Sequence, residues 1–168
     1  METQPSRLAL QPPDLRFTIR PVQLADATLI QTVCWPDRPP AAVYQLITRA
    51  IQVGRQGRGL GVVVMDSREG PLRGYGQVML WPRCAEISDL IVAEDFRGRG
   101  FGTAIIQYLT RAAQQMEAEC VEIGVALSNP GALALYRRLG FVDSHTLMLN
   151  LGEGQEPVLF LRLGLENE

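Results

Sequence analysis

The chain lacks the features that would place it in a membrane-bound or nucleic-acid-binding class. No apolar run approaches the roughly 18–20 residues that a membrane-spanning helix needs, and the amino-terminal residues contain no hydrophobic signal core. The formal net charge of -2 gives no overall attraction to nucleic acid or to an anionic membrane. We therefore expect a cytoplasmic protein with neither nucleic acid nor membrane as a partner.

Residues that bind metals or form disulfides are also scarce. His145 is the single histidine, which excludes a multi-histidine metal site, and it lies in an alternating segment typical of a strand. The cysteines are odd in number and far apart: Cys34, Cys84 and Cys120. This spacing predicts neither a disulfide framework nor a zinc site. We expect three buried or half-buried thiols that pack as small hydrophobic residues, and no bound metal.

The sequence does contain enough apolar residues for one globular domain. A length of 168 residues with 46% hydrophobic content suits a single core. Residues 1–14 hold three prolines and little periodicity, which predicts a loose arm. The rest, 15–168, has no linker or repeat that would divide it, so we expect a single domain.

The spacing of apolar residues predicts the element order β-α-α-β-β-β-α-β-α-β-β. Strands are expected at 17–20, 61–66, 74–81, 86–92, 120–126, 146–151 and 158–163, and helices at 24–33, 41–53, 101–116 and 130–139. Consecutive strands in the middle of the chain argue against a fully parallel, doubly wound fold. They favour an α+β domain with a mixed sheet.

The most informative segment is a glycine-rich turn between the strand at 86–92 and the helix at 101–116. It reads Arg97-Gly98-Arg99-Gly100-Phe101-Gly102-Thr103. Such a turn leaves backbone N–H groups free at the positive end of the helix dipole, where they bind phosphate oxygens. Glycines allow close approach, and the two arginines add positive charge. The P-loop pattern fails because no Gly-Lys-Ser/Thr follows, and the dinucleotide fingerprint fails because Thr103 replaces its last glycine.

The spacing Arg97-x-x-Gly100-x-Gly102 resembles the first signature of the GCN5-related N-acetyltransferase (GNAT) superfamily. The segment 56–61 spells the same pattern, but it follows a helix and leads into a strand, so we interpret it as a flexible turn. A second signature follows the strand at 120–126 and reads Asn129-x-x-Ala132-x-x-Leu135-Tyr136-x-x-x-Gly140-Phe141. The two signatures in this order make the chain similar to the superfamily over 86–141, and more loosely over 17–165.

This resemblance implies a mostly antiparallel sheet of about seven strands with helices on both faces. The sheet is expected to splay at its centre into a V-shaped cleft that holds acetyl-CoA. The amides from Arg97 to Thr103 would hold the CoA pyrophosphate. The backbone of the preceding strand would lie along the pantetheine arm, at Leu90, Ile91 and Val92. Asn129 would contact the pantetheine or steady its loop, and its residue type also suits a helix N-cap.

The same resemblance assigns the catalytic groups. Tyr136 matches the general acid, which donates a proton or a hydrogen bond to the departing CoA thiolate. Since the pKa of a phenol exceeds that of a thiol, hydrogen-bond stabilisation is the favoured form of this role. Glu86, within Ala85-Glu86-Ile87, resembles the base of histone-acetylating members. Asp89 is the competing carboxylate, pointing to the opposite face if the strand is regular, and a water chain is a third route.

We therefore expect an N-acetyltransferase that moves the acetyl group of acetyl-CoA to a primary amine by direct attack in a ternary complex. The acceptor is a small-molecule amine or a peptide or protein amine. A non-catalytic acyl-CoA-binding or regulatory module is the alternative, and a general phosphate- or nucleotide-binding protein is a third reading. A late strand at 158–163 is a candidate for pairing two copies into a homodimer.

Overall fold

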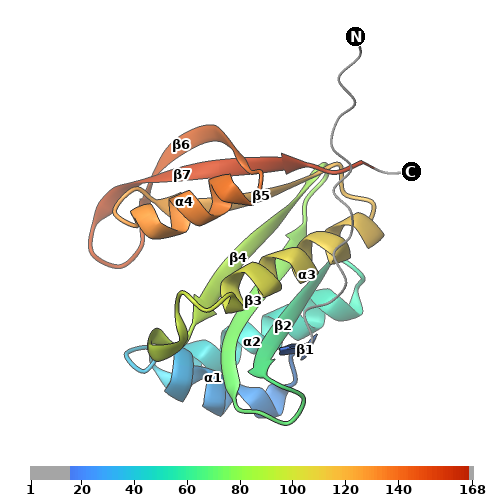
Figure 1. Ribbon diagram of the computed structural model, residues 1–168, viewed down its shortest axis with the longest axis vertical. Helices are drawn as coiled ribbons and strands as arrows, with labels where there is room; N and C mark the ends of the chain where they lie inside the picture. Colours follow the sequence, from blue (N-terminus) through green and yellow to red (C-terminus); the bar gives the residue numbers. More distant parts are fainter. Residues whose placement is uncertain (1–15, 167–168) are drawn as a thin grey trace.

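Figure 1 shows a computed structural model of the protein, which describes residues 16–166. The expected arm at 1–14 lies outside the described residues. Seven strands form one sheet in the order β1-β2-β3-β4-β5-β7-β6. The strands are β1 Phe17–Pro21, β2 Gly59–Asp66, β3 Leu72–Leu80, β4 Cys84–Val92, β5 Cys120–Ala126, β6 Val142–Asn150 and β7 Gln155–Gly164. The helices are α1 Ala27–Cys34, α2 Pro40–Arg55, α3 Phe101–Gln115 and α4 Pro130–Arg138. The predicted α+β class and mixed sheet are confirmed.

The sheet opens between its two central strands. β4 and β5 are the parallel pair, joined by the crossover through α3, and every other pairing is antiparallel. Their register covers only Cys84–Ile87 of β4 against Cys120–Ile123 of β5. Beyond these residues, β4 stays with β3 as far as Val92, while β5 stays with β7 as far as Ala126. The two halves of the sheet therefore diverge, as Figure 1 shows, and the expected V-shaped opening is confirmed.

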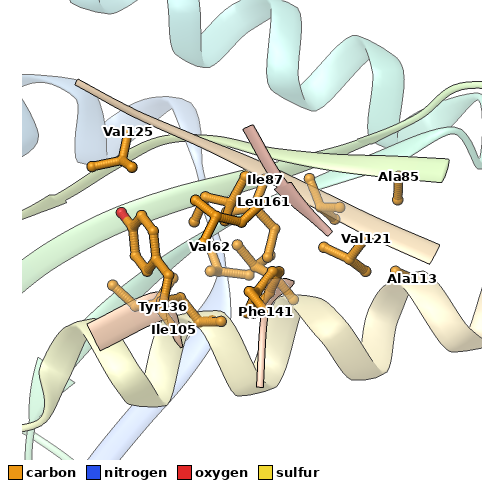
Figure 2. Packing of buried hydrophobic residues seen from close by; sticks show 14 of the residues in the cluster. Val62, Ala85, Ile87, Ile105, Ala113, Val121, Val125, Tyr136, Phe141 and Leu161 are labelled. Carbon is orange, nitrogen blue, oxygen red and sulfur yellow. The ribbon is translucent and has the colours of Figure 1, made fainter. Parts of the chain in front are cut away.

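Helices cover both faces of the sheet. α3 and α4 pack on one face, where their buried side chains belong to the larger hydrophobic cluster. Figure 2 shows part of this cluster. α1 and α2 pack on the other face. α3 buries Ile105, Leu109 and Ala113 at helical spacing. Each fully buried Ile or Leu contributes roughly 1.5–3 kcal/mol. β3 allows this close approach because a Cβ at Gly76 would lie 2.6 Å from Cγ2 of Ile105.

The expectation of three unpaired thiols is wrong for two of them. Cys84 and Cys120 form a disulfide, with 4.5 Å between their Cα atoms. They are 36 residues apart in the sequence, and the parallel register of β4 and β5 places them side by side. Cys34 remains free and buried, as expected. His145 lies on β6, where its ring stacks on Phe160 at 5.0 Å between ring centroids.

The late strand expected to pair with a second copy is also not available. β7 is hydrogen-bonded to β5 on one side and to β6 on the other, so it lies inside the sheet. The outer edge on this side of the sheet belongs to β6, which returns outside β7 and is exposed along almost its whole length. Strand pairing between two copies at this end of the sheet would therefore use β6.

A partly buried ion pair fixes the entry to α1, and it predicts how stability depends on pH. Asp26 is 7% exposed and accepts two hydrogen bonds of 2.8 Å from the Arg20 guanidinium and one from the Gln23 amide. The hydrogen bonds from Arg20 hold the pKa of Asp26 below its ordinary value. A carboxyl group whose pKa is lowered by folding stabilises the protein at pH values above its pKa in the unfolded chain, near 3.9. That contribution is lost as the pH falls through the pKa of the group in the folded protein.

We expect Asp26→Asn to lower the free energy of unfolding by about 2 kcal/mol at neutral pH, because it leaves the guanidinium without its partner. Urea denaturation between pH 3 and 7 measures this. The difference between wild type and variant should shrink below pH 4. Asp143→Asn is the matched control, because it breaks a fully exposed pair with Arg137 and should change stability little. Equal losses in the two variants would contradict the prediction.

Candidate active site

The glycine-rich turn ends at the amino terminus of α3. Gly98 and Gly100 adopt left-handed φ values of 75° and 92°, which explains why glycine stands at both positions. The first helical hydrogen bond runs from the Ala104 amide to the Gly100 carbonyl, so the N–H groups just before Ala104 remain free at the helix end. The Arg97 side chain donates to the Val92 carbonyl at 3.1 Å, which ties the turn back to β4. This end of α3 is suited to binding an anion.

Gly102 is not explained by contacts within the protein. It lies in the first turn of α3, and its φ is not left-handed. A Cβ there would come no closer than 3.8 Å to Val92 and 4.0 Å to Leu135, which are ordinary contacts. Alanine would therefore fit without displacing these side chains, so packing within the protein does not require glycine at this position.

β4 contains a bulge where the sheet begins to open. Tyr75 of β3 faces Ile91 and Gln77 faces Ser88, so Asp89 and Leu90 together face the single residue Gly76. Asp89 has a left-handed φ of 51°, which is uncommon for a residue other than glycine. Such strain is characteristic of functional sites. A regular strand would turn Asp89 to the face opposite that of Glu86. Because the strand is irregular here, the two side chains do not lie on opposite faces.

Both carboxylates instead line one pocket between α2 and the sheet. Its volume is about 510 Å³, and its walls are Ala42, Gln45, Leu46, Arg49, Gln77, Met79, Trp81, Glu86, Ser88 and Asp89. The Trp81 indole N–H donates to the Glu86 carboxylate at 3.2 Å. No sequence motif marks Arg49, Gln77 or Trp81. They belong to the pocket because helical and strand periodicities turn them to the same side.

Tyr136 lies on the other face of the sheet. The side chain is 7% exposed, and its ring packs in the cluster with Ile105 and Phe141. In Figure 2 its hydroxyl points toward Val125, on the part of β5 that has left β4. Burial raises the pKa of Tyr136 to about 12. The Asn129 side chain accepts from the Ala132 amide at 3.2 Å, so its predicted capping role is confirmed.

These groups lie on different sides of the opening in the sheet. Leu90 and Val92 pack toward α3, and Ile91 packs toward α1 and α2. On the side that faces β5, the end of β4 has no paired strand. Its backbone groups there can bind an extended ligand. The free edge thus runs from the amino terminus of α3 to the bulge, with Tyr136 on one face and the carboxylate pocket on the other.

Residues 16–166 contain neither a metal-binding cluster nor a membrane-spanning helix. No three His, Cys, Asp or Glu side chains are grouped in a way that could hold a metal ion. None of the described helices is long and apolar enough to cross a membrane.

The chain is similar to known acetyltransferases. The acetyltransferase (GNAT) family matches residues 24–141. An uncharacterized N-acetyltransferase of Methanocaldococcus jannaschii is 41% identical over 63 residues, which are 38% of this chain and 28% of that protein. The N-alpha-acetyltransferase MAK3 of Arabidopsis thaliana is 32% identical over 94 residues, 55% of this chain and 44% of that protein. This chain spans less than half the length of these two curated relatives.

A solved structure shares the fold over nearly the whole chain. RimL, a ribosomal L7/L12 alpha-N-protein acetyltransferase in complex with coenzyme A, has a TM-score of 0.79 at 14% identity. The match covers 94% of this chain and 98% of that one. The family match includes the turn before α3, the bulge in β4 and the helix that carries Tyr136. The chain belongs to the acetyltransferase (GNAT) family.

Proposed function

We propose that this protein transfers the acetyl group of acetyl-CoA to a primary amine. The observation that carries the proposal is the free amino terminus of α3 beside the unpaired edge of β4, exactly where the sheet opens. The amides of the turn from Arg97 to Thr103 would bind the CoA pyrophosphate. The backbone of Leu90, Ile91 and Val92 would lie along the pantetheine arm. The glycine at 102, which no contact within the protein requires, supports this fit.

The reaction would proceed by direct attack in a ternary complex. The neutral amine attacks the thioester carbonyl carbon, and backbone amides at the bulge stabilise the charge that develops on the carbonyl oxygen. The C–S bond then breaks, and the sulfur leaves with its electron pair. Tyr136 donates a hydrogen bond to this thiolate. The acceptor nitrogen loses one proton before the attack, while it is still an ammonium group, and a second proton from the tetrahedral intermediate. The second proton ends on the sulfur of CoA.

The acceptor would enter from the pocket lined by Glu86, Asp89 and Trp81. Carboxylates attract an ammonium group, which supports an amine over an alcohol or an acid as the acceptor class. The names of similar proteins include an N-alpha-acetyltransferase and spermidine N-acetyltransferases. Both names describe acetylation on nitrogen. We propose a primary amine on a small molecule, a peptide or a protein.

A screen of acceptors tests this function. The protein is incubated with acetyl-CoA and a panel of small amines, amino acids, peptides and lysine-containing proteins, and released CoA thiol is measured. We expect thiol release that depends on one acceptor class. Tight CoA binding without thiol release on any acceptor would favour the non-catalytic module. Calorimetric preference for ATP or NAD over CoA would favour a general nucleotide-binding protein.

A further inference from the structure

Asp89 and Glu86 share a pocket but differ in their distance from the opening in the sheet. Glu86 lies in the section where β4 still pairs with β5, opposite Glu122, and its carboxylate is held by the Trp81 indole. Asp89 lies past the last paired residue, directly before the free edge. At about 3.3 Å per residue, the two positions are roughly 10 Å apart along the strand. Asp89 is the carboxylate next to the expected place of the thioester.

A chain of polar side chains runs along the α2 face of the sheet to Asp89. The buried Tyr75 hydroxyl donates to Oε1 of Gln77 at 2.7 Å, and Nε2 of Gln77 donates to the Ser88 hydroxyl at 3.3 Å. The Ser88 hydroxyl in turn hydrogen-bonds to the Asp89 carboxyl group. These contacts place the Ser88 hydroxyl beside the carboxylate that the bulge turns into the pocket.

The surroundings of Asp89 combine low solvation with a few charges. Burial raises the pKa of Asp89 above its ordinary value, whereas the charge of Arg38 and the hydrogen bond from Ser88 oppose this rise. The guanidinium of Arg38 stacks on Trp35 at 4.2 Å, in the connection between α1 and α2. The other ionisable groups that face Asp89 are Arg49 from α2, Tyr75 from β3 and Glu86 from β4.

We propose that Asp89, rather than Glu86, accepts the proton that the acceptor ammonium must lose before attack. This inference rests on the proposed acetyl transfer. One N–H bond of the ammonium breaks, its electron pair stays on nitrogen, and the proton moves to a carboxylate oxygen and from there to solvent. The freed pair forms the C–N bond of the tetrahedral intermediate, and the C–S bond breaks afterwards. Ser88 and Gln77 are positioning residues, because they act by orienting Asp89.

Asp89→Asn tests the proposal with little change of shape. Asparagine also tolerates the left-handed conformation, so the bulge should persist. At pH 7 we expect kcat/KM for the amine to fall about 100-fold, as for removal of a general base. At pH 9.5 the difference should narrow to about tenfold or less, because about a tenth of an amine with pKa near 10.4 is neutral without help, compared with roughly one molecule in 2500 at pH 7. An equal loss at every pH, or no loss, would overturn the proposal.

Glu86→Gln is the matched control, since it neutralises the other carboxylate of the pocket. We expect mainly a higher KM for the amine, with a loss that does not change with pH. A pH-dependent loss in Glu86→Gln but not in Asp89→Asn would assign the base to Glu86. Ser88→Ala should move the acid limb of kcat/KM to higher pH, because it removes a hydrogen bond that favours the charged carboxylate. If the acid limb of Ser88→Ala does not move, Ser88 does not position Asp89.

The failure of this inference can be distinguished from failure of the proposed function. Wild type and variants are first compared for CoA affinity by calorimetry, which should be the same in all of them. If the wild type releases no thiol with any amine, acetyl transfer itself is wrong. If the wild type is active and Asp89→Asn matches it at pH 7, only the role of Asp89 is wrong.

Discussion

Gly102→Glu is expected to lower the affinity for CoA at least 100-fold while the protein stays folded. The added carboxylate would lie in the first turn of α3, beside the proposed position of the pyrophosphate. Two like charges about 4 Å apart at a protein surface repel by roughly 4 kcal/mol, which exceeds the 2.7 kcal/mol of a 100-fold change. The protein itself should accept the side chain, because a Cβ at this position makes only ordinary contacts. Calorimetric titration with CoA measures the loss, and thermal melting checks the fold.

The sequence contains its own control for this variant. The segment 56–61 spells the same pattern as the turn before α3, but it connects the end of α2 to β2. A Cβ at Gly57 would meet nothing within 4 Å, so Gly57→Glu adds the same charge to an open turn. Gly57 has a left-handed φ of 69°, so this variant strains its own turn, which thermal melting measures, and leaves the amino terminus of α3 unchanged. Its CoA affinity should equal that of the wild type. Equal losses in the two variants would show that charge alone weakens binding, and would contradict the assigned site.

Gly102 is a better position for this test than Gly100. Gly100 adopts a φ of 92°, and its Cβ would lie 3.4 Å from the Phe17 ring. Any side chain there strains the backbone, so lost binding could reflect a distorted turn. At Gly102 the backbone is helical, so a loss of CoA affinity is caused by the added side chain and not by a distorted turn. Gly102→Ala should fall between wild type and Gly102→Glu, because a methyl group is smaller and carries no charge.

The helices and strands with a clear periodicity of apolar residues could be predicted from the sequence. β5 occupies Cys120–Ala126, as expected, and α3 begins at Phe101 and ends one residue before the expected limit. Apolar periodicity identifies such elements because each buries one face or both. β6 begins at Val142, four residues before the expected start. Its side chains are exposed on both faces, so no alternation of apolar and polar residues marks its beginning.

Features that depend on register between distant strands could not be predicted. The disulfide requires Cys84 and Cys120 to be partners across a parallel pair, and sequence spacing carries no such information. The bulge at Asp89 likewise depends on how β4 meets β3. Neighbouring residues give no turn signal there, because Asp89 lies within a run of strand-forming residues. A regular strand was the natural expectation, and it put the two carboxylates on opposite faces.

Tyr136→Phe is expected to lower kcat about 30-fold, within the range for loss of an acid catalyst or its hydrogen bond. Affinity for CoA should change less than about threefold, because the ring stays in its packing with Phe141 and only the hydroxyl is lost. Stability should change little as well, because the Tyr136 hydroxyl makes no hydrogen bond within residues 16–166 that the variant would lose. Steady-state kinetics and CoA titration together measure the separation of kcat from binding.

The pH dependence of this variant shows what the hydroxyl does. With the pKa of Tyr136 near 12 and that of a thiol near 8.5, full proton transfer to the thiolate is unfavourable by roughly 5 kcal/mol. A hydrogen bond to the developing thiolate has no such cost, so the 30-fold loss should be constant from pH 6 to pH 9. Tyr108→Phe, which removes a hydroxyl from α3, is the control and should keep the wild-type kcat. A loss in Tyr136→Phe that disappears at high pH would instead indicate that proton donation by Tyr136 limits the reaction.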